Sequence, residues 1–107
     1  MGSKEIIKGT LRIIVLKLLA ENKRMYGYEI TQRVKELSDQ EIELTFGALY
    51  PTLHKLEAEG LLTTKTVIID GRARKYYSLT SLGSEQAKVE VKQYLSFAKA
   101  LNLVLKF

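Results

Sequence analysis

The feature that most constrains this chain is a leucine-rich helical segment that leads directly into a β-hairpin pattern. Leu49, Leu53 and Leu56 recur at spacings of four and three residues, which predicts one apolar face of a helix. Thr45 can cap the start of this helix through its hydroxyl, and Gly60 can end it as a left-handed cap. This order restricts the fold to those in which a helix precedes a projecting two-stranded ribbon.

Pro51, the only proline of the chain, lies inside this helical segment. It removes the backbone donor that would have bonded the carbonyl of Gly47. Two alternatives follow: the helix bends at Pro51, or its regular part begins near Pro51, where proline is tolerated. In both cases we expect an irregular first turn that pushes Tyr50 outward.

The hairpin pattern consists of two β-rich runs joined by a strong turn signal. Residues 61–69 are rich in Thr, Val and Ile, residues 72–79 predict the return strand, and Asp70-Gly71 predicts a two-residue turn. Adjacent strand residues point to opposite faces. The turn length pairs Ile69 with Arg72, Val67 with Arg74 and Lys65 with Tyr76.

This hairpin is strongly cationic, with one acidic residue, at the turn, to oppose the positive charges. Clustered cations beside phosphates gain affinity by releasing counterions, so we predict a DNA contact here. The alternative is a solvated charged turn. Tyr76 and Tyr77 face opposite ways, so we expect one of them in the core and the other half exposed. The four cations are Lys65, Arg72 and Arg74, which share one face, and Lys75, which points to the other.

Two further helices are expected before this region and one after it. Apolar residues at alternating spacings of four and three predict a helix over about 5–21, and a second over about 27–37. Thr80 can cap a last helix that runs to residue 107, whose apolar positions form a heptad seam. No other part of the chain is large enough to cover so long a helix, so we expect a second copy to pack on it with help from the first helix. The expected dimer-interface residues are Ile7, Leu11, Ile14, Ala87, Val91, Tyr94, Ala98, Leu101 and Leu105.

Three helices followed by a hairpin give a fold class that is mainly α with a small β-hairpin: a winged helix-turn-helix plus a long C-terminal dimerisation helix. We expect residues 1–80 to form the DNA-binding domain and residues 81–107 the dimerisation helix. The third helix would enter the major groove, which exposes distinct donor and acceptor patterns. Tyr50 packing against the hairpin and His54 as a solvated side chain are the alternatives to DNA contact. The candidate DNA-binding residues of this helix are Thr45, Gly47, Tyr50, Thr52, His54 and Lys55.

Charge and composition agree with a polyanionic partner. The chain has 107 residues, enough for one domain, and a formal charge of +5. It contains no cysteine, which fits a reducing compartment, and its apolar runs are too short to span a bilayer. We therefore expect a cytoplasmic protein without a membrane partner.

The sequence offers little chemistry for an enzyme. His54 is the only histidine and there is no cysteine, which leaves no His/Cys metal cluster and no Cys–His pair. We expect neither catalysis, nor a metal, nor a cofactor. The alternative function is a winged-helix protein-interaction module whose basic hairpin meets acidic side chains; exposed Thr and Tyr beside a cationic tip suit phosphate better.

Several strings of the chain resemble the PadR family of bacterial transcriptional regulators. The resemblance covers about residues 8–105 and is closest to the compact subgroup with a single C-terminal helix. The middle and hairpin strings are specific in combination. The matching strings are Tyr26-Gly27-Tyr28-Glu29-Ile30, Gly47-Ala48-Leu49-Tyr50-Pro51-Thr52-Leu53 with Leu56-Glu57 and Gly60-Leu61, Gly71-Arg72-Ala73-Arg74-Lys75-Tyr76-Tyr77, and Leu79-Thr80 with Gly83.

The resemblance implies a homodimeric repressor that binds an inverted-repeat operator on double-stranded DNA. Family members dimerise through the last helix with help from the first, and some release DNA on binding aromatic acids or planar drugs. Tyr94 lies where a drug-binding relative carries tryptophan, so the resemblance implies an aromatic small-molecule effector near Tyr94. The alternative, which we favour at this position, is that Tyr94 packs in the helix seam.

Overall fold

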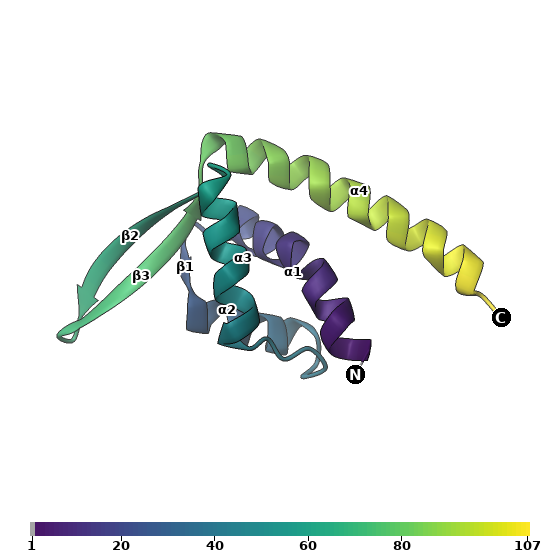
Figure 1. Cartoon of the computed structure of the whole chain (residues 1–107), viewed down its shortest axis with the longest axis horizontal. Coiled ribbons are helices and arrows are strands. Elements are labelled where there is room, and N and C mark those ends of the chain that lie inside the picture. The colour runs from purple at the N-terminus through teal and green to yellow at the C-terminus, as the bar shows by residue number, and fades with distance from the viewer. Residues whose placement is uncertain (1) are drawn as a thin grey trace.

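A computed structural model describes residues 2–107, with side-chain environments from residue 5 onward. Figure 1 shows α1, α2 and α3 gathered at the centre, the β2–β3 hairpin projecting to one side, and α4 running across α1 and out to the other side. The chain measures 54 × 29 × 20 Å along its principal axes, which reflects these two projections. The elements are α1 (Gly2–Glu21), β1 (Met25–Tyr26), α2 (Gly27–Leu37), α3 (Phe46–Ala58), β2 (Leu62–Ile69), β3 (Arg72–Leu79) and α4 (Ser81–Leu105).

The core lies where α1, α2 and α3 meet the inner face of the sheet. Leu49, Leu53 and Leu56 of α3 are at most 1% exposed, as their four-three spacing predicts. Leu16 of α1 and Tyr77 of β3 are equally buried, and burial raises the pKa of Tyr77. The predicted apolar face of α3 therefore packs in the core between the other helices and the sheet.

The third helix begins at Phe46 and is continuous through Pro51, so the alternative in which its regular part begins near Pro51 is wrong. Thr45 caps the helix as predicted, because its hydroxyl oxygen accepts from the Ala48 amide at 3.2 Å. Gly47 is exposed, so water can bond the carbonyl that Pro51 leaves without a donor. At the other end Gly60 has φ +79°, as expected of a left-handed cap.

The hairpin register is the one that the two-residue turn predicts. Ile69 pairs with Arg72, and Asp70 and Gly71 both have positive φ, as a turn of this hand requires. The third strand, β1, was not expected from sequence; it pairs antiparallel with β3 and gives the order β1-β3-β2. At its end the amide of Tyr26 donates to Glu29 Oε1 at 3.1 Å, which starts α2 at the predicted place.

The start of α4 is fixed against the end of α3. The Thr80 hydroxyl accepts from the Gly83 amide at 3.0 Å and donates to the Gly60 carbonyl at 2.7 Å. A Cβ at Gly83 would collide with the carbonyl of Leu61, so glycine permits this close approach. From there α4 packs along α1, and its C-terminal turns extend beyond the other elements (Figure 1).

Two expected dimer-interface residues are instead core residues of the single chain. Leu11 of α1 and Ala87 of α4 are each 1% exposed, and both belong to the hydrophobic core of the single chain. The expectation of a partner contact at these two residues is corrected accordingly.

Candidate nucleic-acid interface

The outer surface of α3 carries most of the predicted DNA-contact residues. Its aromatic residues form a row along one side, with ring centroids 5.7 Å apart for Phe46 and Tyr50 and 6.3 Å apart for Tyr50 and His54. Phe46 is 48% exposed and was missed by the sequence reasoning, although its four-residue spacing from Tyr50 was a usable signal. Thr45, Gly47, His54 and Lys55 are exposed, and Tyr50 and Thr52 are half-buried.

Tyr50 is held in the gap between α3 and α2. A Cβ at Gly27 would collide with the Tyr50 hydroxyl, so the phenol end lies against the first residue of α2. The ring also packs against the hydrophobic core, although it is partly exposed. The structure therefore gives Tyr50 a packing role between two helices, and contact with a base remains a prediction.

Two threonines of this surface differ in how far their hydroxyls are committed. The Thr52 hydroxyl donates to the Ala48 carbonyl at 3.4 Å, within the helix. The Thr45 hydroxyl accepts the capping bond, which leaves its own proton free to donate. Thr45 lies exposed at the N-terminal end of α3, and its contact with DNA remains a prediction.

The β2–β3 hairpin, called the wing below, carries its cations on both faces, as the confirmed register requires. Lys65, Arg72 and Lys75 are exposed, whereas Arg74 is half-buried. The Arg74 guanidinium lies over the Tyr26 ring at 4.1 Å from its centroid. This contact orients the Arg74 side chain, and Lys75 Nζ lies 5.5 Å from the centroid of the Tyr77 ring. Lys65 and Arg72 are exposed.

A second stacked arginine lies on the same face of the sheet. The Arg24 guanidinium lies 4.0 Å from the centroid of the Tyr76 ring, and Tyr76 meets Tyr26 edge to face at 5.5 Å. Tyr76 is consequently only 9% exposed, so the expectation that one tyrosine of the pair is half exposed is wrong. The signal that could have revealed this cluster is an Arg-x-Tyr pattern that occurs at both 24–26 and 74–76, because each places a cation and a ring on one strand face.

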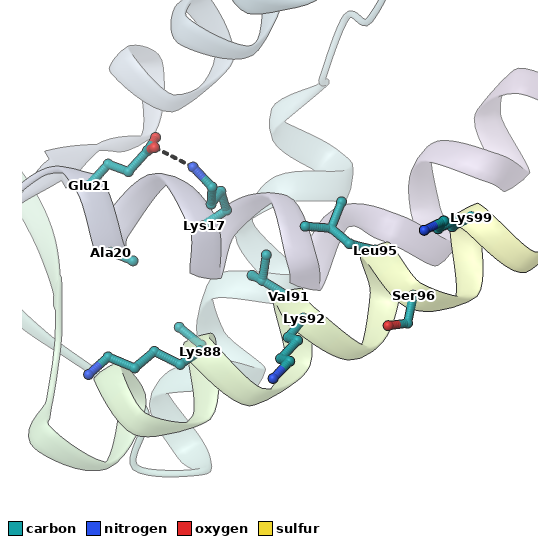
Figure 2. Close-up of a pocket in the computed structure, with 10 residues that line it drawn as sticks. Lys17, Ala20, Glu21, Lys88, Val91, Lys92, Leu95, Ser96 and Lys99 are labelled. Carbon is teal, nitrogen blue, oxygen red and sulfur yellow. Dashed lines mark hydrogen bonds and ion pairs between the residues drawn. The ribbon is translucent and has the colours of Figure 1, made fainter.

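A groove of about 560 Å³ runs between α1 and α4. Figure 2 shows Val91 and Leu95 pointing from α4 toward α1, and Lys17 paired with Glu21 at the opposite wall. Tyr94 is not part of the groove; its ring lies 6.5 Å from that of Phe97. The lining residues are Lys17, Ala20, Glu21, Ala87, Lys88, Val91, Lys92, Leu95, Ser96 and Lys99.

The remaining predicted dimer residues keep surface that a second copy can cover. Ile7 and Ile14 on α1 and Val91, Tyr94 and Ala98 on α4 are half-buried. The final turns of α4 are bare, with Leu101 40% and Leu105 60% exposed. Their neighbours Phe97, Leu103 and Val104 are 59%, 70% and 78% exposed.

Within residues 2–107 no three His, Cys, Asp or Glu side chains gather closely enough to hold a metal ion. No helix in that range is both long and apolar enough to cross a membrane.

The helix order, the three-stranded sheet and the projecting hairpin define a winged helix-turn-helix protein. The model of the transcriptional regulator PadR-like family matches residues 15–89, and the chain belongs to this family. It is 40% identical over 80 residues to the transcriptional regulator Rv3488 of Mycobacterium tuberculosis, a match that covers 75% of this chain and 71% of that protein.

Solved structures agree with this assignment. A transcriptional regulator from Clostridium thermocellum superimposes with a TM-score of 0.84 at 26% identity, covering 95% of this chain and 99% of that one. A PadR family regulator from Eggerthella lenta gives a TM-score of 0.76 at 30% identity, covering 95% of this chain and 87% of that one. The chain is thus a PadR-like transcriptional regulator in which a single helix, α4, follows the hairpin.

Proposed function

We propose that this regulator acts as a homodimer that binds an inverted-repeat operator and represses transcription. The observation that carries the proposal is the contrast on α4: its first half is covered by α1, while Leu101 and Leu105 stand bare at its end. A second copy related by a two-fold axis would cover this stripe and present two recognition helices together. Half-buried Ile7 and Ile14 on α1 extend the apolar surface available to the partner.

In this proposal α3 reads the major groove and the wing grips the flanking backbone or minor groove. Exposed Thr45, Gly47, His54 and Lys55 supply polar groups and a close backbone approach. The wing residues Lys65, Arg72 and Lys75 supply phosphate contacts, which set the register of the protein on the duplex and carry little sequence information. A cytoplasmic location is part of the proposal, since the regulator would have to reach genomic DNA.

The test is a binding series on operators selected from random DNA. We expect the selected duplexes to contain two inverted half-sites, and affinity to fall steeply when one half-site is scrambled. Binding that is equal on selected and random duplexes would contradict sequence-specific recognition. Capture of an acidic protein in place of DNA, at matched salt, would favour the interaction-module function.

We also propose that a small aromatic acid regulates the protein, and that it enters the groove between α1 and α4. The apolar floor formed by Val91 and Leu95 suits a ring, and Lys88 and Lys92 among the lining lysines suit a carboxylate. A series of hydroxycinnamates and benzoates tests this: a bound acid raises the melting temperature and releases the operator. No shift with any member of the series would remove the effector from the proposal.

A further inference from the structure

One arginine ties three helices together at the base of α4. Arg12 of α1 donates to Glu59 from Nη1 at 2.8 Å and from Nη2 at 2.9 Å. It also donates to Glu90 from Nε at 2.7 Å and from Nη2 at 2.9 Å. Gln86 donates to Glu90 at 2.8 Å, which holds that carboxylate from its other side. The guanidinium thus binds two carboxylates at once, which a lysine ammonium cannot do with the same geometry.

The two carboxylates belong to α3 and α4, and the angle between these helices would set how a dimer presents its recognition helices to DNA. Glu59 is the C-terminal cap of α3, the recognition helix, and Glu90 lies in the third turn of α4. The other ion pairs between described residues lie within one helix or join α2 to the segment that follows it. The Arg12 cluster is therefore the ion-pair connection between the recognition helix and the dimerisation helix, in addition to the hydrogen bond from Thr80 to the Gly60 carbonyl at the start of α4.

Simple lever geometry shows why this connection matters. The part of α4 beyond Glu90 is about 22 Å long at roughly 1.5 Å per residue. A tilt of about 10° at Glu90 would move the far end by about 4 Å, which is close to the ~3.4 Å that separates successive base pairs. In a dimer joined through that far end, a small change of angle changes the half-site separation by about one base pair.

We propose that Arg12 is a positioning residue that sets the angle between α3 and α4, and through it the half-site spacing that the dimer accepts. The inference rests on the proposed function, since it needs a dimer that reads two half-sites. Arg12 itself contacts no DNA in this account. It acts through Glu59 on one side and Glu90 on the other.

The test uses the full chain and a set of duplexes that carry the selected half-sites with spacers one or two base pairs shorter or longer. We expect the wild-type chain to prefer one spacer over its neighbours by about tenfold or more, since mis-set contacts at a half-site cost about as much as a mismatched base pair. Arg12→Gln should reduce this preference to about threefold or less, while affinity for a single half-site and the dimer dissociation constant stay within about twofold. Arg12→Lys should behave like Arg12→Gln, because the charge alone does not reproduce the double fork.

Two further variants keep the test decisive. Arg33→Gln removes the same charge and breaks a pair that lies within α2, so it should retain the wild-type spacer preference. Glu59→Gln removes only the α3 arm at an exposed position, so it tests the proposal if Arg12→Gln does not fold.

The possible outcomes distinguish a failure of the proposed function from a failure of the positioning role of Arg12 alone. A wild-type chain without any dependence on two half-sites would overturn the proposed function and this inference together. A wild-type chain with a sharp spacer preference that Arg12→Gln and Glu59→Gln both retain would overturn the positioning role alone. Loss of preference in Arg33→Gln as well would also overturn it, because the effect would then follow net charge.

Discussion

The helices α3 and α4 carry the same apolar spacing of four and three residues, and its outcome differs between them. Leu49, Leu53 and Leu56 of α3 are buried within the chain, whereas Leu101 and Leu105 of α4 are 40% and 60% exposed. Periodicity specifies a helix and its apolar face, but it does not specify what covers that face. In α3 the cover is α1 and the sheet; at the end of α4 we propose that it is a second copy.

The largest effect is expected from a cavity beneath α3, in the core of the chain. Leu53→Ala removes a fully buried side chain from the centre of the core and should lower the free energy of unfolding by about 2–5 kcal/mol. Urea denaturation at several protein concentrations measures this. A loss below about 1 kcal/mol would show that α3 is less closely packed than its burial indicates.

The matching change at the exposed end of α4 should weaken dimer formation. Leu101→Ala should weaken dimer formation by about 1–3 kcal/mol if Leu101 is a central interface residue, and should leave the intrinsic stability of each chain nearly unchanged. Concentration-dependent melting distinguishes the two effects. Lys99→Ala, on the same helix, is the control and should change neither quantity by more than about 0.5 kcal/mol.

The wing allows the same comparison between a committed and a free side chain. Arg72→Ala and Arg74→Ala should each lower the slope of log affinity against log salt by about 1. Only Arg74→Ala should also destabilise the fold, by about 0.5–1 kcal/mol, because it removes the guanidinium from the Tyr26 ring. Salt titrations and urea melts of both variants test this, and equal stability losses would contradict the distinction.

The smallest effect concerns the pH dependence of the Arg12 cluster, which links α3 to α4. The hydrogen bonds from Arg12 lower the pKa of Glu59 and of Glu90 below the ordinary value of 4.5. Both groups therefore contribute stability above pH 4.5 that is lost as the pH falls through their folded pKa values. Solvent screening keeps this contribution small at such partly exposed groups. Acid titration of unfolding should show a shallower decline in the Glu59→Gln, Glu90→Gln double variant, and identical curves would contradict the shifts.

Local signals in the sequence predicted most of the fold. The register of the hairpin follows from Asp70-Gly71, and the caps at Thr45 and Thr80 follow from hydroxyls placed before apolar runs. The strand β1 was missed because its two residues carry no periodicity and owe their pairing to β3. Strand existence here depends on a partner far along the chain, which no local pattern contains.

The candidate site was less predictable, because its geometry depends on contacts between distant residues. Arg12 and Glu90 are far apart in the sequence, and nothing near either residue indicates that they meet. The burial of Tyr76 beneath Arg24 likewise depends on β1. Leu11 was assigned to the interface because a helical stripe looks the same whether it faces its own chain or another.

Sedimentation equilibrium of the purified chain over a micromolar concentration range tests the central claim most directly. The account predicts the mass of two chains, with dissociation to single chains shifted to higher concentration by Leu101→Ala and unchanged by Lys99→Ala. A wild-type chain that sediments as a single 12.2 kDa subunit throughout this range would contradict the claim that a second copy covers the end of α4.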